Sequence, residues 1–283
     1  MGTDFLRGVR RHEAQKGDGK NYRGVKPLRL VDVHCHLESE VYTGSLDRVV
    51  ADAARAGVRK MITSSIEPGQ WDLSESIASR FEEVEFALGI HPWYCAPGDI
   101  ERIPALAEAK NRGAVAIGEI GLDKKSPLRP MELQQAVFGE QLKIARDIDL
   151  PVIIHCRGAF EELRDFLKKT GAPKAGGILH TFSGSVEIAE EFMKYGLSFS
   201  FGGVLTYRNS RKKREVLKKI YPERMLLETD SPDIPPVEAR GVPNVPANIL
   251  HVLRAAAELL DVPEEEIAET TTRNASRIFK LAV

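Results

Sequence analysis

Eight short apolar runs alternate with longer amphipathic stretches from Leu30 onward, and this alternation restricts the possible folds more than any other feature of the chain. The runs cover residues 30–33, 61–63, 86–88, 114–117, 152–154, 178–179, 197–201 and 225–227. Between them, apolar residues recur every three or four positions, as in residues 46–56, 131–148, 159–169 and 186–195. Short apolar runs are typical of buried strands and the wider spacing of helices, so the sequence predicts an α/β fold of repeated strand–helix units.

Repeated strand–helix units give parallel strands, and eight such units in about 250 residues match a closed (β/α)8 barrel, the TIM barrel. An open, doubly wound sheet is the alternative. That fold would be expected to carry a glycine-rich phosphate-binding sequence after its first strand, whereas this chain has H-C-H-L-E-S-E there. We therefore expect a barrel whose active-site residues lie at the carboxyl ends of its strands.

Residues 1–29 differ in composition from the rest of the chain. They contain eight Lys or Arg and three acidic residues, a net charge of +5, with little apolar periodicity. This composition predicts a flexible basic arm, which either contacts nucleic acid or is a solvated extension without a site of its own. Residues 30–283 form the predicted barrel domain.

The overall charge limits how a polyanion could be bound. The chain has 40 Lys and Arg against 41 Asp and Glu, a net charge of −1, so a polyanion must be held by local positive charge. Three cysteines, Cys35, Cys95 and Cys156, make no paired disulfide framework, which favours the reducing cytoplasm. No apolar stretch approaches the roughly 20 residues that a bilayer requires, and the first residues lack the apolar segment of a signal peptide. We expect a cytoplasmic protein without a membrane partner.

Histidines gather at the ends of the predicted strands. Five of the seven end or follow an apolar run, namely His34, His36, His91, His155 and His180. Glu119 follows the fourth run and Asp230 follows the eighth. An isolated histidine near a strand end is usually structural, but the carboxyl ends of parallel strands meet at one end of a barrel, so these side chains predict one shared site.

Imidazole and carboxylate groups together suit a divalent metal such as zinc, manganese or magnesium. Residues i and i+2 of a strand point the same way, so His34 and His36 can bind one ion together with Asp230. His155 and His180 would bind a second ion, and Glu119 is the natural bridge. Two ions about 3.5–4 Å apart activate water and neutralise phosphodiester oxygens, which is the chemistry of hydrolysis. Asp230 could also accept the proton of the nucleophile, so Asp230 and Glu119 are the predicted catalytic residues.

Seven motifs together resemble the TatD family of metal-dependent hydrolases. They are D-V-H-C-H-L, G-I-H-P, A-I-G-E-I-G-L-D, L-P-V-I-I-H-C-R, L-H-T-F-S-G-S, L-L-E-T-D-S-P and T-T-R-N-A-S-R-I-F, in the order of the family and from residue 31 to about residue 279. The resemblance implies a TIM barrel of the amidohydrolase type, one or two divalent metal ions, and deoxyribonuclease activity, with some members acting on other esters, including D-aminoacyl-tRNA. It places His34, His36, Glu119 and Asp230 on one metal and Glu119, His155 and His180 on the other.

The chain departs from the family where substrate contacts are expected. Trp93 lies beyond the proline of G-I-H-P, where a histidine is common, and Lys124 and Lys125 follow G-L-D in place of aromatic residues. The common H-S-R-D-A reads H-C-R-G-A here, and R-G-K-R-N-E-P reads R-G-V-P-N-V-P. These changes spare the expected metal ligands. The residues predicted to contact substrate are His91, Trp93, Lys124, Arg157 and Arg208, and Arg208 opens a basic run that includes Arg211, Lys212, Lys213 and Arg214.

The sequence therefore predicts a divalent-metal-dependent hydrolase. The leading hypothesis is an exonuclease-type deoxyribonuclease, with DNA as the substrate and single-stranded ends favoured because the site would be open. A second hypothesis within enzymes is hydrolysis of carboxylic esters or lactones, or deacylation of D-aminoacyl-tRNA. A hypothesis from another class is a catalytically weak, metal-binding nucleic-acid adaptor.

Overall fold

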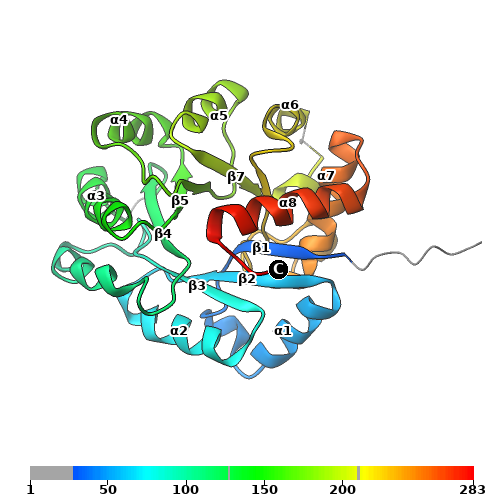
Figure 1. The fold of residues 1–283 in the computed structure, drawn as a ribbon, viewed down its shortest axis with the longest axis horizontal. Helices are drawn as coiled ribbons and strands as arrows, with labels where there is room; N and C mark the ends of the chain where they lie inside the picture. Colours follow the sequence, from blue (N-terminus) through cyan, green and yellow to red (C-terminus); the bar gives the residue numbers. More distant parts are fainter. Residues whose placement is uncertain (1–27, 127, 209–210) are drawn as a thin grey trace, which may run out of the picture.

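Eight parallel strands form one sheet in the order of the sequence, and helices surround it (Figure 1). The computed structural model describes residues 28–126, 128–208 and 211–283. Its strands are β1 (Leu30–Cys35), β2 (Val58–Ser64), β3 (Val84–Leu88), β4 (Ala116–Asp123), β5 (Val152–Arg157), β6 (Gly177–Leu179), β7 (Leu197–Phe201) and β8 (Met225–Leu227). Each predicted apolar run overlaps one strand, and the predicted (β/α)8 barrel is confirmed. The predicted arm lies outside the described residues apart from Leu28 and Arg29.

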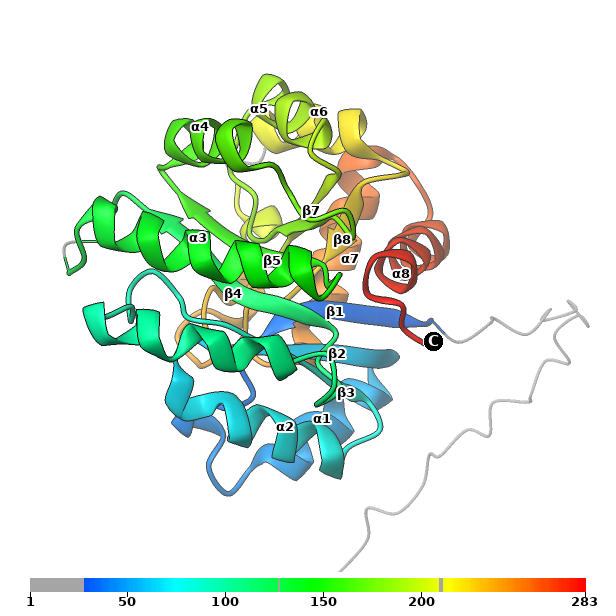
Figure 2. The ribbon, with the colours of Figure 1, turned by 60° about the vertical axis from the view of Figure 1, so that its left-hand side comes forward.

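Helices alternate with the strands around the outside of the barrel (Figure 2). They are α1 (Leu46–Arg55), α2 (Trp71–Arg80), α3 (Met131–Asp147), α4 (Phe160–Thr170), α5 (Val186–Met193), α6 (Arg211–Ile220), α7 (Ile249–Leu260) and α8 (Glu264–Phe279). Short 3-10 helices, η1 (Glu40–Tyr42), η2 (Pro68–Gln70), η3 (Pro97–Glu101), η4 (Ile103–Glu108), η5 (Gly203–Thr206), η6 (Val237–Ala239) and η7 (Pro246–Asn248), lie in the connections. Within the described ranges, no helix is both long enough and apolar enough to cross a membrane.

The apolar core has two parts, and the smaller part fills the inside of the barrel. It contains strand residues that point inward together with residues of α8 and the segment after it. These residues are Val31, Val33, Ile62, Ala87, Ala116, Ile153, Ile178, Leu226, Ala275, Ile278, Phe279 and Leu281. Most of the strand residues in this set lie before the polar site residues of their own strands. Helix α8, which crosses in front of the strands in Figure 1, therefore closes the amino-terminal end and leaves the carboxyl end for the site.

The barrel is joined between its first and last strands by loop hydrogen bonds. Paired ladders run from β1–β2 through β7–β8. At the remaining seam, the Asp230 N–H donates to the carbonyl of His34 (3.0 Å), and the His36 N–H donates to the carbonyl of Ser231 (2.7 Å). The bonds that close the barrel therefore also set the relative positions of three predicted metal ligands.

Candidate metal centre

The structure brings together all six residues that were predicted to bind metal. His34, Glu119 and His155 lie within β1, β4 and β5, and His36, His180 and Asp230 follow β1, β6 and β8. All six are buried or nearly so; Glu119, for example, is 2% exposed. Six polar side chains from five strands therefore lie together at the carboxyl end of the barrel.

The fourth strand differs from its prediction. It spans Ala116–Asp123 instead of residues 114–117, so Glu119 lies inside the strand and not after it. The continuous apolar run stops at Ile117 because Glu119 and Asp123 face the polar site while Ile120 and Leu122 pack in the apolar core. The pairing with β5 continues as far as Asp123 opposite Arg157. Gly89 permits this packing, because a Cβ there would lie 2.6 Å from the backbone carbon of Gly118.

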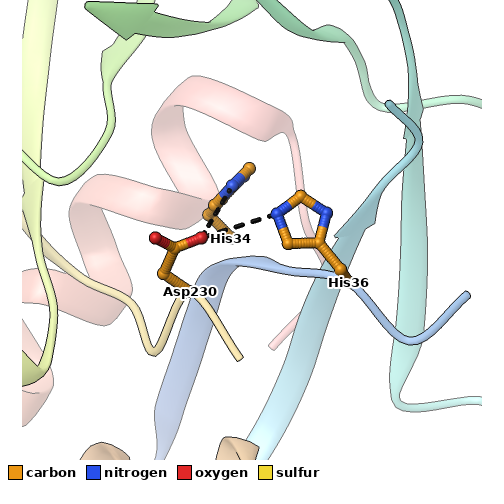
Figure 3. Close-up of side chains that lie close together, drawn as sticks. All are labelled: His34, His36 and Asp230. Atoms are coloured by element: carbon orange, nitrogen blue, oxygen red, sulfur yellow. Dashed lines mark ion pairs between the residues drawn. The ribbon is translucent and has the colours of Figure 1, made fainter. Parts of the chain in front are cut away.

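One oxygen of Glu119 faces the first cluster, which we define as His34, His36 and Asp230. Glu119 Oε2 lies 3.3 Å from His34 Nε2 and 3.5 Å from His36 Nε2. Asp230 Oδ1 lies 3.4 Å and 3.5 Å from the same two nitrogens, and Figure 3 shows both imidazoles directed at this carboxylate. Each of the two nitrogens therefore faces two carboxylate oxygens.

The other oxygen of Glu119 faces the second cluster, which we define as His155 and His180. Glu119 Oε1 lies 3.0 Å from His155 Nδ1 and 2.8 Å from His180 Nε2, and these two nitrogens are 3.1 Å apart. The two carboxylate oxygens of Glu119 are thus divided between the clusters, which is the arrangement expected of a bridging ligand.

The spacing of the first cluster fits a cation better than it fits hydrogen bonds. Two ligand atoms that each lie about 2.1 Å from one tetrahedral ion are about 3.4 Å apart, and the four nitrogen–oxygen separations of the first cluster and Glu119 are 3.3–3.5 Å. His34, His36 and Asp230 also have ligand atoms close enough together to share one ion. His34 Nε2 is fully buried and has no hydrogen-bond partner among the described residues. A buried nitrogen without a partner, aimed at two carboxylates, is consistent with a position for a metal ion.

Burial and neighbouring charge shift the pKa values of these groups in opposite directions. Burial alone would raise the pKa of Glu119, but the nearby imidazoles outweigh it and hold this pKa well below the usual range. The pKa of Asp230 is also lowered, because His34 and His36 outweigh its burial. Burial alone would lower the pKa of His155, but its hydrogen bonds with Asp123 and Glu119 raise it to about 9. Ionised carboxylates therefore attract either protons or a metal ion to the imidazoles.

His91 contacts the second cluster in a different role. Its Nδ1 accepts the backbone N–H of Trp93 (3.1 Å), and its Nε2 lies 3.2 Å from Glu119 Oε1. Burial lowers the pKa of His91, so the ring is neutral and its proton lies on Nε2. His91 therefore donates a hydrogen bond toward Glu119, although its position beside Glu119 and His155 resembles that of a ligand.

Asp123 and Ser64 orient the imidazoles, and the sequence analysis did not identify either residue. Asp123 is fully buried, and its Oδ2 lies 3.0 Å from His155 Nε2 and accepts the Trp93 indole N–H (2.6 Å). Ser64 contacts the first cluster through Oγ, 3.1 Å from His34 Nδ1, and through its carbonyl, 2.8 Å from His36 Nδ1. Such partners fix the orientation of metal-ligating imidazoles.

A further buried carboxylate supports the loops at the carboxyl end. Glu228 is fully buried and accepts hydrogen bonds from the Thr181 N–H (2.6 Å) and hydroxyl (2.7 Å). Thr181 and Asp230 both have positive φ angles, 42° and 55°, which are uncommon for residues other than glycine. Strained backbone at two positions beside the clusters is typical of a functional site.

The residues predicted to contact substrate lie at the carboxyl end in different settings. The guanidinium carbon of the exposed Arg157 lies 5.9 Å from the centre of the Trp93 ring. Lys124 is paired with Glu162 (2.6 Å) at the surface. Arg208 is exposed and lines a cavity between the loops after β7 and β8.

One lysine of the basic run has a structural contact. Lys213, in α6, donates a hydrogen bond from Nζ to the carbonyl of Val204 (2.8 Å), and burial lowers its pKa to about 8. Its ammonium group therefore supports the loop after β7.

Comparisons with known proteins agree with this architecture. The family model described as "TatD related DNase" matches residues 31–280. The chain is 36% identical over 253 residues to the uncharacterized metal-dependent hydrolase YabD of Bacillus subtilis (strain 168), covering 89% of this chain and 99% of that protein. The crystal structure of YjjV, a TatD homolog from Escherichia coli K12, superposes with a TM-score of 0.85 at 34% identity, covering 91% of this chain and 100% of that one. A TatD family hydrolase from Entamoeba histolytica shares the fold, with a TM-score of 0.77 at 21% identity, covering 90% and 99% of the two chains.

Proposed function

Because this chain belongs to the TatD-related family of metal-dependent hydrolases, we propose that it is a deoxyribonuclease of the exonuclease type. The observation that carries the proposal is the division of the Glu119 carboxylate between two groups of buried ligand atoms. A bridged pair of cations is a recurring device for hydrolysing phosphodiesters.

We assign the metal ligands by cluster. His34, His36 and Asp230 would hold one divalent ion together with Glu119 Oε2, and His155 and His180 would hold a second together with Glu119 Oε1. Magnesium, manganese and zinc are the candidates, and the share of imidazole ligands favours zinc. Bound there, the ions would lower the pKa of a water molecule and neutralise negative charge on the phosphodiester.

The residues of the chain supply the remaining chemistry. Asp230 has one oxygen, Oδ1, directed at the first cluster, and the second, Oδ2, lies 3.4 Å from the Thr181 hydroxyl. Asp230 is ionised at neutral pH, and its Oδ2, which is not directed at the imidazoles, can accept the proton of the attacking water. His91, neutral and protonated on Nε2, can donate a hydrogen bond to Glu119 or to a substrate oxygen.

Positive charge and an aromatic ring beside the second cluster support a nucleic acid as substrate. Arg157 and Trp93 lie together at this edge, and Trp93 is fixed by its hydrogen bond to Asp123. Arginine binds phosphate and aromatic rings stack on bases, a combination suited to single-stranded ends. Lys124 can add to this contact, because its surface pair with Glu162 is of the weak kind that water and salt screen.

The deciding experiment compares substrates on one preparation. The protein is stripped of metal with a chelator, supplied again with magnesium, manganese or zinc, and given end-labelled DNA, RNA, D-aminoacyl-tRNA and a lactone in parallel. We expect DNA to be shortened from its end only after metal is returned. Full activity in chelator would contradict metal dependence, and faster turnover of the lactone or the aminoacyl-tRNA would replace the nuclease with an esterase or deacylase.

His34→Ala is the matched variant for this experiment, with His251→Ala as its control. His251 lies on α7, 3.8 Å from Glu238, and touches neither cluster. We expect only the His34 variant to lose metal and activity.

The cysteines at positions 35, 95 and 156 are free thiols, and on that ground we propose the cytoplasm as the place of action.

A further inference from the structure

A cavity of about 550 Å³ lies between two loops at the carboxyl end of the barrel. It is lined by Tyr207 and Arg208, which follow η5 after β7, and by Val237 and Arg240, which lie in or beside η6 after β8. Its volume lies within the range of about 300–1,000 Å³ that is usual for small-molecule sites. Neither the family match nor the two metal clusters assigns a role to this cavity.

The walls of the cavity are held together by hydrogen bonds between the two loops. The Tyr207 hydroxyl donates to the carbonyl of Pro235 (2.7 Å), and the Thr206 hydroxyl oxygen accepts the Val237 N–H (2.8 Å). Gly203 allows the loops to meet, because a Cβ there would lie 2.3 Å from the carbonyl oxygen of Ile234. These contacts therefore fix the backbone on both sides of the cavity.

The lining combines positive charge with flat and apolar surface. It contains two arginines and no acidic residue. The guanidinium carbon of Arg240 lies 4.6 Å from the centre of the Tyr207 ring, a contact that orders the side chain. Val237 is 42% exposed. A ligand that matches this lining carries negative charge and a planar, partly apolar group.

The cavity and the first cluster share a loop. Asp230 opens the segment after β8 that continues through Pro235 to Arg240, and a hydrogen bond from the Asp233 N–H to the Asp230 carbonyl folds it back on itself. The five steps along the chain from Asp230 to Pro235 span at most about 18 Å when extended. A strand of nucleic acid that enters the metal centre can reach the cavity within a few nucleotides.

Resting on the proposed nuclease function, we propose that the cavity bounded by Tyr207, Arg208 and Arg240 is a nucleotide subsite for a single-stranded DNA chain. Arg208 and Arg240 bind a phosphate of a nucleotide that is not being cleaved, and its base packs against Tyr207 and Val237. Guanidinium groups pair with phosphate oxygens in a forked geometry, and unstacked bases pack on aromatic and guanidinium planes. The subsite therefore favours strands long enough to reach it, while the two metal clusters bind the phosphodiester that is cleaved.

The test separates the subsite from the metal centre by the size of the substrate. Arg208→Gln and Arg240→Gln are combined in one variant, and both side chains are exposed, so the fold is expected to survive. Arg254→Gln, on α7 and paired with Glu264, is the matched control. Each protein is assayed on a single-stranded thymidine oligomer and on bis(4-nitrophenyl) phosphate, which is too small to reach both places.

We expect the double variant to raise the Michaelis constant for the oligomer about tenfold, with kcat unchanged. The dependence of this constant on salt should weaken by about 0.7 in the slope of log affinity against log salt for each lost phosphate contact. Cleavage of the small diester should be unaffected. An unchanged Michaelis constant for the oligomer, or equal losses on both substrates, would overturn the subsite.

A binding measurement keeps the subsite separable from the proposed function. Fluorescence anisotropy of a labelled oligomer with metal-free protein reports binding without cleavage. Binding that depends on Arg208 and Arg240, with no cleavage after metal is returned, would support the subsite and contradict the nuclease. No binding by the wild-type protein would overturn the subsite itself. Tyr207→Phe, which keeps the ring and loses the bond to Pro235, should bind nearly as well as the wild type, whereas Tyr207→Ala should bind more weakly.

Discussion

The two halves of the candidate metal centre are built differently, although one carboxylate serves both. The first cluster joins the two ends of the sheet, β1 and β8, and its ligand atoms are 3.3–3.5 Å apart. The second cluster comes from neighbouring strands, and its atoms are 2.8–3.1 Å apart, within ordinary hydrogen-bond distance. The first half is thus spaced for a cation, whereas the second half is held together by its own hydrogen bonds.

The groups behind the imidazoles differ as well. In the first cluster, His34 and His36 contact the hydroxyl and carbonyl of Ser64, which are neutral. In the second, His155 contacts the carboxylate of Asp123, whose pKa falls to about 2 because its hydrogen bonds outweigh burial. A charged partner makes the imidazole of His155 a stronger ligand and also a stronger base. In the first half, burial alone would lower the pKa of His34, but Glu119 and Asp230 raise it, so a metal ion must displace protons from both halves.

The largest loss of metal and activity is expected from substitution of Glu119, which contacts both clusters. Glu119→Ala removes the one residue that both clusters share, so both should lose metal and turnover should fall to the background. Metal content by elemental analysis and initial rates measure this. Glu75→Ala is the control, because that carboxylate pairs with Arg112 away from the clusters. Loss of metal from only one half would show that Glu119 is not a bridge.

Asp230→Asn should damage the first cluster with little effect on the fold. Asparagine retains the size of the side chain and tolerates the positive φ of 55° at this position. It cannot accept a proton at neutral pH, so kcat should fall by about 10²–10⁴. Steady-state rates and a thermal melt measure the two expectations. Near-normal turnover would leave Asp230 with a structural role only.

Substitutions of Asp123 and Ser64, which contact the imidazoles, should affect the two clusters separately. Asp123→Asn should weaken metal binding at the second cluster by about 10–100-fold. Ser64→Ala should act on the first cluster and by less, because the Ser64 carbonyl still contacts His36. Calorimetric titration of metal-free protein resolves two binding steps. The same step weakened in both variants would contradict the division into two halves.

The smallest expected effect is the dependence of metal binding on pH. The raised pKa of His155, about 9, means that this ring is protonated in metal-free protein at neutral pH. Its contribution to the stability of metal-free protein is complete below about 6.5, the unfolded value, and is lost as the pH rises through about 9. Metal binding must therefore release a proton below pH 9.

Calorimetry in two buffers with different ionisation enthalpies measures that proton release. We expect about one proton from His155 at pH 7.5, fewer at pH 9.5, and fewer at either pH in Asp123→Asn. Equal heats in both buffers at pH 7.5 would show that the imidazoles are neutral before metal enters.

The barrel and the six candidate ligands could be predicted because each depends on local pattern. A short apolar run is recognisable in any strand of a parallel barrel, and a polar residue at its end points to the shared face. The same reasoning failed to identify Asp123, although its even spacing from Glu119 on one strand was a usable signal. A register shift between Ile117 and Ile120 disturbs that alternation, so spacing alone could not place the side chain.

Contacts between distant segments could not be read from the sequence. The Trp93 indole reaches Asp123 across 30 positions, and the Tyr207 hydroxyl reaches the Pro235 carbonyl across 28. Lys213 is a further example, because it belongs to the basic run after the seventh strand and yet its ammonium group donates to a loop carbonyl. Charge patterns indicate a face of a helix, but the direction of one long side chain depends on its neighbours.

The seam between β1 and β8 also determines when the centre can form as the chain is made. His34 and Asp230 are 196 positions apart, which a ribosome adding about 5–20 residues per second covers in about 10–40 s. Glu119, His155 and His180 are all present 50 positions before Asp230. All ligands of the second half are therefore synthesised before Asp230, whereas the first half must wait for the last strand.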